Sequence, residues 1–148
     1  MESKMFYSRQ LVIADLSDCM RALPPSLRPR AVLLTAWPGF EIPDEALYPL
    51  LEALIRREAE WFVCVGTQSA RLHDLIDRHI VLNVKDLRLV EDRTIATTWH
   101  DCEPLEKAVD FFLFTVGMQD WDDRSHLAIL NLDAPQDAQI GALLRARC

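Results

Sequence analysis

The sequence lacks the long apolar runs and closely spaced cysteines that mark membrane and disulfide-rich proteins. No apolar run approaches the ~18 residues that a membrane-spanning helix needs, and residues 1–10 lack the apolar core of a signal peptide. The four cysteines are widely spaced, which fits neither a zinc knuckle nor a disulfide framework. We therefore expect a cytoplasmic protein with reduced thiols and no association with membranes.

Motifs for cofactors, metals and familiar catalytic chemistry are also missing. The turn Gly66-Thr-Gln-Ser has neither the GxGxxG spacing nor the P-loop pattern, and there is no GxSxG elbow. The four histidines show no HxxxH or HExxH pairing. These absences predict no cofactor and no metal site, and they disfavour an enzyme.

Positive charge is scarce in this chain. Lys and Arg number 16 against 23 Asp and Glu, which gives a formal net charge of −7. Such a charge repels phosphate backbones, so we expect no nucleic-acid partner, whereas a basic protein would be attracted. The length of 148 residues fits one ordinary domain covering residues 1–148.

Short apolar runs alternate with segments of helical periodicity. Runs typical of buried strands cover residues 11–14, 31–36, 61–65 and 127–132, and a β-branched stretch covers residues 93–98. Apolar residues at helical spacing predict helices over residues 17–23, 44–58, 105–116 and 135–145, and a further helix from residue 69. The alternation predicts an α/β fold, a single three-layer sandwich with a mostly parallel sheet of about five strands and helices on both faces.

Several details of these elements follow from individual residues. Ser17, Ser69 and Asp133 are expected to cap helices, and Pro49 to kink or restart the second helix. Residues 80–84 fit either the end of a helix or a short strand, and their β-branched content favours the strand.

In such a sheet the loops at the carboxyl ends of the strands converge, and ligands tend to bind there. These loops are expected at residues 37–43, 66–69, 99–103 and 133–135.

The sharpest chemical candidate in these loops is His100-Asp-Cys102. A thiol near a helix N-terminus, with an imidazole two residues away, could have a lowered pKa and act as a nucleophile. The simpler interpretation is that Cys102 is a small residue at a helix start and His100 a polar turn residue. The simpler interpretation is favoured, because no other loop offers a clear third catalytic member.

Aromatic residues outside the expected core suggest a contact surface. In the helix over residues 105–116, Phe114 falls in the middle of the charged face and Phe111 at its edge. The segment that follows places one large aromatic residue among three carboxylates, namely Asp120, Trp121, Asp122 and Asp123. An aromatic centre with an acidic rim suits recognition of a basic protein. Alternatively, Trp121 covers Phe114 as part of the protein's own packing, or Phe111 and Phe114 close a homodimer.

The segment Thr97-Thr-Trp-His-Asp-Cys-Glu-Pro-Leu-Glu-Lys-Ala, with Phe111-Phe-Leu-Phe after it, resembles a signature of a family of small uncharacterised bacterial α/β proteins. The resemblance implies a bacterial cytosolic α/β domain, and it supplies no catalytic residues. It covers about 20 residues strongly and the surrounding strand pattern loosely.

Two functions are consistent with these observations. The first is a non-catalytic protein-binding domain, of the kind used as an immunity or antitoxin-like protein that masks a basic partner. The alternative is a small α/β enzyme, or a binder of nucleotide-type ligands, that uses the carboxyl-end crevice around His100 and Cys102.

Overall fold

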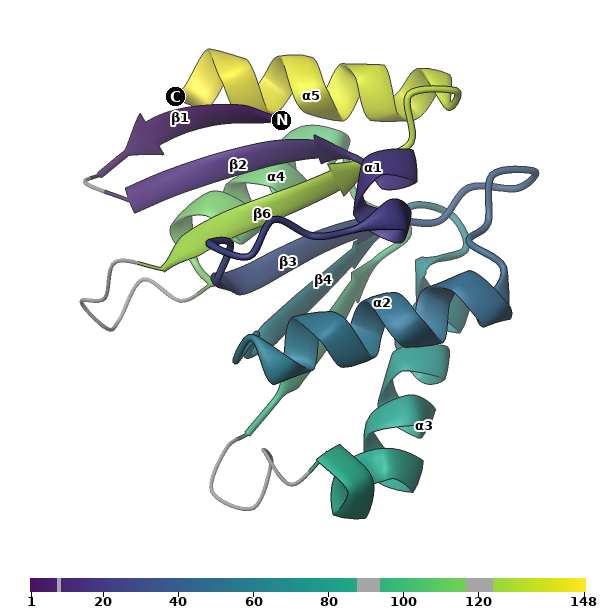
Figure 1. Cartoon of the computed structure of the whole chain (residues 1–148). Helices are drawn as coiled ribbons and strands as arrows, with labels where there is room; N and C mark the ends of the chain where they lie inside the picture. Colours follow the sequence, from purple (N-terminus) through teal and green to yellow (C-terminus); the bar gives the residue numbers. More distant parts are fainter. Residues whose placement is uncertain (8, 88–93, 117–123) are drawn as a thin grey trace.

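A six-stranded sheet forms the centre of the computed structural model, which describes residues 1–7, 9–87, 94–116 and 124–148, with residues 84–87 described by their backbone alone. The strands are β1 (Glu2–Phe6), β2 (Arg9–Asp15), β3 (Pro29–Thr35), β4 (Trp61–Val65), β5 (Ala96–His100) and β6 (Ser125–Leu130). They lie in the order β1-β2-β6-β3-β4-β5 (Figure 1). Only the β1–β2 pair is antiparallel among these neighbours.

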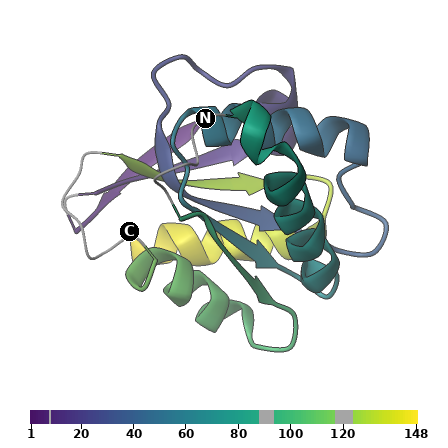
Figure 2. The same cartoon turned by 90° about the horizontal axis from the view of Figure 1, so that it is seen from below.

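Helices cover both faces of this sheet. On one face lie α1 (Leu16–Arg21), α2 (Asp44–Arg56) and α3 (Ser69–Leu87), and on the other lie α4 (Leu105–Phe114) and α5 (Pro135–Arg147) (Figures 1 and 2). The expected three-layer sandwich with a mostly parallel sheet is therefore confirmed. None of the helices in the described part of the chain is long and apolar enough to cross a membrane.

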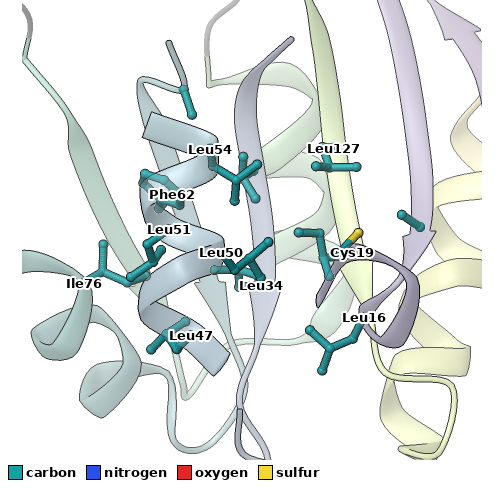
Figure 3. Close-up of a cluster of buried hydrophobic side chains, with 14 of the residues drawn as sticks. Leu16, Cys19, Leu34, Leu47, Leu50, Leu51, Leu54, Phe62, Ile76 and Leu127 are labelled. Atoms are coloured by element: carbon teal, nitrogen blue, oxygen red, sulfur yellow. The ribbon is translucent and has the colours of Figure 1, made fainter. Parts of the chain in front are cut away.

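The core consists of two apolar layers separated by the sheet. Along β3, Val32 and Leu34 point into the layer under α1–α3, while Ala31 and Leu33 point into the layer under α4 and α5. Both β3 and β6 are buried along their whole length, which explains their continuous apolar runs. Figure 3 shows part of the first layer, with Leu16, Cys19, Leu34, Leu47, Leu50, Leu51, Leu54, Phe62, Ile76 and Leu127. Burying each such Leu or Phe side chain contributes about 1.5–3 kcal/mol to the free energy of unfolding.

Two elements differ from the sequence-based expectations. Residues 80–84 are helical, because α3 continues to Leu87, so the predicted strand is wrong. Ile80 packs against the first layer in helical register with Leu72 and Ile76, and α3 continues through it although Val81 and Leu82 are exposed. The strand β1 was not predicted, and its charged residues Glu2 and Lys4 hide the alternation that places Phe6 in the core.

The predicted helix starts are also corrected. The cap of α5 is Ala134 rather than Asp133, and α1 begins at Leu16, after Asp15, rather than after Ser17. Ser69 is the first residue of α3, and its hydroxyl has no hydrogen-bond partner among the described residues.

Pro49 lies inside α2, which nevertheless runs unbroken from Asp44 to Arg56, so the helix does not restart there. Its ring lies in the second turn of α2, where a proline removes only one backbone hydrogen bond.

Neighbouring strands lead to helices on opposite faces at three places in the sheet, namely β2/β6, β6/β3 and β4/β5. The chain passes through β2, β3, β4 and β5 with helices on one face, returns through α4 on the other, and inserts β6 between β2 and β3. The carboxyl ends of β3 and β6 therefore lead to α2 and α5 on opposite sides of the sheet (Figure 1). Crevices at such points commonly bind ligands.

Candidate functional site

A buried carboxylate, Asp137, fills the point where β3 and β6 lead to opposite faces. Asp137 lies in the first turn of α5 and is only 1% exposed. The Thr35 hydroxyl donates to its Oδ2 atom at 2.6 Å, and the Trp37 indole N–H donates to its Oδ1 atom at 2.7 Å. The backbone N–H of Asn131 also donates to Oδ2, at 2.7 Å. The carboxylate thereby ties α5 to the ends of both β3 and β6.

The electrostatics of Asp137 reflect this position. Burial raises the pKa of the carboxyl group, and the hydrogen bonds from Thr35, Asn131 and Trp37 oppose that rise. Its lone pairs already accept three donors, so the group is suited to holding the fold together. Sequence reasoning placed the loop at Trp37 in the crevice but missed Asp137, whose signal is an acidic residue in the first turn of a helix.

His100 lies at the carboxyl end of β5 and has two polar neighbours. Its Nδ1 atom contacts a Glu103 carboxylate oxygen, and its Nε2 atom lies 3.2 Å from the Thr98 hydroxyl. The ring packs 4.7 Å from that of Phe111, and the side chain is 10% exposed. The structure thus joins an acid, an imidazole and a hydroxyl. Sequence reasoning missed Thr98, although residues two apart on a strand share a face.

The neighbouring Cys102 is not part of this chain of contacts. Its thiol is exposed, and both nitrogens of His100 face other groups. A hydrogen bond to Asp101, together with the negative charge of Asp101, raises the pKa of the Cys102 thiol. The hypothesis of a nucleophile with a lowered pKa required the opposite direction.

The two predicted phenylalanines of α4 lie in different environments. Phe111 is partly buried against the second apolar layer and His100, whereas Phe114 is 38% exposed at the last residue of α4. The Phe114 ring makes edge contacts with Phe6 at 6.5 Å and with Tyr7 at 5.7 Å between ring centroids. Phe114 is thus the member of the pair that reaches the surface.

Tyr7 extends the aromatic surface in a way that the sequence did not indicate. Its side chain is 72% exposed, directly after β1. Its φ angle of 45° is a left-handed conformation that bulky residues seldom adopt, and such strain is often found at functional sites. We call the exposed pair, with the buried Phe6 beneath it, the Tyr7–Phe114 patch. The predicted rim residues Asp120, Trp121, Asp122 and Asp123 lie outside the described residues.

Within the described ranges, no three His, Cys, Asp or Glu side chains are grouped as metal ligands would be.

Comparisons with known proteins give the family of the chain. No curated protein and no solved structure matches it. A family model described as a domain of unknown function, DUF7684, matches residues 6–147. This match includes all three members of the Tyr7–Phe114 patch, the contacts of His100 and the Asp137 cluster. The chain therefore belongs to the DUF7684 family, an uncharacterised family of domains.

Proposed function

We propose that the protein is a non-catalytic domain that binds a basic protein through the Tyr7–Phe114 patch, as an immunity or antitoxin-like protein would. The observation that carries this proposal is the exposure of two large aromatic rings, Tyr7 and Phe114, that contact each other, with Phe114 also contacting the buried Phe6. The proposed setting is the bacterial cytoplasm, which the resemblance of the segment Thr97–Ala108 implies.

The packing of the patch supports a role in binding. Aromatic side chains bury a large area on binding while losing little conformational freedom, and they dominate the energy of many protein interfaces. Phe6 is held in the core and contacts Phe114, so Phe114 is oriented before any partner arrives. A preoriented ring loses less entropy on binding than a free one.

The charge of the chain supports a basic partner. The formal net charge is −7, so a positively charged protein is attracted over long distances. The acidic residues Asp120, Asp122 and Asp123 follow Phe114 closely in the sequence and are proposed to add to this attraction.

The test is affinity capture from a lysate of the source organism, with three forms of the full chain. We expect the wild type to retain a basic protein, and the double variant Tyr7→Ser, Phe114→Ser to lose it. Leu132→Ser is the matched control, because Leu132 is exposed and follows the carboxyl end of β6, far from the patch. Thermal melting should show that all three forms are folded at the temperature of the capture, with the lowest melting temperature in the double variant, which loses the contact of Phe114 with Phe6. Capture of no protein by the wild type, or equal capture by the double variant, would refute the proposal.

A second candidate function is an acyl-transferring enzyme, which the contacts of His100 favour. Glu103 would orient the imidazole, and His100 would take the proton of the Thr98 hydroxyl as its oxygen bonds to an ester carbonyl carbon. The ester C–O bond would then break, and His100 would return the proton to the departing alcohol, which leaves the acyl group on Thr98. Thr98 replaces Cys102 in this alternative, because the pKa of Cys102 is raised. Labelling of Thr98 by a fluorophosphonate probe, lost in His100→Asn, would support it, whereas an unlabelled wild type would dismiss it.

A further inference from the structure

The strand β5 forms one edge of the sheet. Its alternate residues bond to β4, since the Ala96 N–H donates to the Glu60 carbonyl at 2.8 Å and the His100 carbonyl accepts from the Gly66 N–H at 3.1 Å. In a parallel pair of strands, every second residue bonds to the neighbouring strand. Because Ala96 and His100 bond on the β4 side, the backbone N–H and C=O groups of Thr97 and Trp99 point away from β4. Figure 2 shows β5 at the near edge, with α3 on one side and α4 on the other, and no described strand lies beyond it.

This edge lacks the usual protection against pairing. Proteins commonly block an open edge with charged residues or proline, and β5, with the sequence Ala-Thr-Thr-Trp-His, contains neither Lys, Arg, Asp, Glu nor Pro. The opposite edge strand, β1, carries Glu2 and Lys4. The two edges of the sheet are therefore chemically different, and β5 is the one suited to pairing.

A large aromatic side chain stands beside the open edge. Trp99 is 50% exposed, and its ring lies 4.5 Å from that of His73 on α3. The two nitrogens of His73 face Asp74 at 3.1 Å and Asp77 at 3.3 Å, which hold the imidazole in place. Trp99 thus offers apolar area next to unpaired backbone groups.

We propose that β5 pairs in antiparallel fashion with β5 of a second copy of this chain, about a two-fold axis at Thr98. Thr97 of one copy then lies opposite Trp99 of the other, and each such pair exchanges two backbone hydrogen bonds. Both outward-facing residues are used, which makes the edge complementary to itself, as a two-fold interface requires. Thr98 lies opposite its own copy, in a type of cross-strand pair that stabilises sheets.

The charges beside β5 favour an antiparallel second copy over a parallel one. Asp101 and Glu103 follow the strand, whereas Thr94 and Ile95, the described residues before it, are uncharged. Antiparallel pairing sets the acidic end of each strand against the neutral end of the other, while parallel pairing would set Asp101 against Asp101. The strand order places β5 at the opposite edge from β1 and the adjacent Tyr7, so this interface is independent of the proposed partner surface.

The first test is the mass of the full chain by sedimentation equilibrium from low to high micromolar concentration. We expect the wild type to approach twice 17.0 kDa, and both Thr97→Pro and Trp99→Lys to remain at 17.0 kDa. Proline at position 97 removes an outward-facing N–H and leaves the bonds to β4 intact. Met5→Lys is the control, because Met5 is an exposed apolar residue on β1, and it should still dimerise. A wild type that stays at 17.0 kDa, even if another protein's strand binds the edge, would overturn the proposal.

A second test fixes the register and does not depend on a destabilising change. In a background with Cys102→Ser and Cys148→Ser, which removes the exposed thiols, Thr98→Cys should form a disulfide-linked dimer under mild oxidation. The Cα atoms of residues that face each other across the axis lie about 4.5–5.5 Å apart, within the range that a disulfide can bridge. Ser3→Cys on β1, an exposed position, should stay monomeric under the same conditions. Equal cross-linking of both variants would contradict the proposed axis.

Discussion

The contacts of Asp137 show how a single side chain can fix the meeting point of three elements. Its carboxylate accepts hydrogen bonds from Thr35, Trp37 and Asn131, which belong to the ends of β3 and β6 and the loops that follow them. A buried donor without an acceptor costs free energy, so these groups depend on one another. Between the carboxyl ends of β3 and β6, where other α/β proteins commonly bind ligands, the Asp137 carboxylate and its three donors bond to one another.

We predict that Asp137→Asn lowers the free energy of unfolding by about 1–3 kcal/mol. Whichever way the amide is oriented, its NH₂ group faces at least one N–H that previously had an acceptor. Urea denaturation followed by circular dichroism measures the change. Asp133→Asn is the control, because Asp133 is exposed and its carboxylate caps no helix. If Asp133→Asn lowers the free energy of unfolding as much as Asp137→Asn does, the structural role assigned to Asp137 is wrong.

The difference in the free energy of unfolding between the wild type and Asp137→Asn should change with pH in a defined direction. The pKa of Asp137 is raised by burial, so the folded state binds its proton more tightly than the unfolded chain. The contribution of this group to the free energy of unfolding therefore decreases as pH rises from the unfolded pKa, near 3.8, through the folded value. Unfolding curves between pH 3.5 and about 7 should show the wild type losing its advantage over Asp137→Asn as pH rises. An advantage that grows with pH would contradict the raised pKa.

The thiol of Cys102 gives a second prediction for a single residue. Asp101 raises the pKa of this thiol, so a smaller fraction is thiolate at pH 7 than in a free cysteine. Alkylation by iodoacetamide should be slow, and Asp101→Asn should accelerate it by lowering the pKa. His100→Ala should change little, because the imidazole contacts Thr98 and Glu103 instead. The measurement is the alkylation rate of Cys102 against pH in a chain that also carries Cys148→Ser. A thiolate present at pH 6 would support the nucleophile hypothesis instead.

At the scale of elements, the turn between β4 and α3 depends on a glycine that has no room for a side chain. Gly66 has a φ angle of 125°, and a Cβ atom there would lie 2.3 Å from the Ala36 carbonyl oxygen. We predict that Gly66→Ala lowers the free energy of unfolding by at least about 3 kcal/mol, because overpacking adds to backbone strain.

Gly39 provides the matched control for this prediction. Its φ angle is 84°, but a Cβ atom there would have nothing within 4 Å. Gly39→Ala should therefore cost only the backbone strain, about 1–2 kcal/mol. Thermal unfolding of both variants separates the two causes, and equal losses would show that steric contact with Ala36 is unimportant.

The elements that the sequence predicted well are those whose signals are local. The strand β4 was predicted with its observed bounds, because Trp61–Val65 is a continuous apolar run between turn residues. The strand β1 was missed because its partner β2 and the helix α5, rather than its own sequence, make it a strand. Residues 80–84 were misassigned because Ile80 packs in helical register with Leu72 and Ile76, and this contact outweighs the small differences in intrinsic propensity.

The candidate sites follow the same rule. Phe114 was identified because it interrupts the charged face of a helix, and His100 because it lies two residues from Cys102 before an expected helix start. Asp137 and Tyr7 were missed. Asp137 matters only through Thr35 and Trp37, which lie about a hundred residues away in the chain. Tyr7 is exposed beside Phe114 because the β1–β2 hairpin brings it there, and its left-handed backbone has no sequence signal.

At the scale of the whole molecule, the sheet separates two proposed interfaces. The Tyr7–Phe114 patch adjoins β1, and the open edge is β5, at the other end of the strand order. Two copies joined at β5 would therefore leave both patches accessible, and a dimer could bind two basic partners. The two interfaces also differ in physical character, since the first is proposed to attract its partner by net charge and the second is an uncharged strand.

This difference predicts opposite responses to salt. Raising the salt concentration from about 0.1 M to 1 M shortens the Debye length from about 10 Å to about 3 Å, which screens attraction to a chain of net charge −7. The association rate of the captured basic partner should fall at least about tenfold, with a smaller change in its dissociation rate, as measured by surface plasmon resonance. The dimer constant from sedimentation should stay the same or tighten, because salt also screens the repulsion between two acidic chains. If the association rate of the partner does not change with salt, the aromatic patch binds without a contribution from net charge. If the dimer dissociates at high salt, ion pairs rather than the backbone of β5 hold it together.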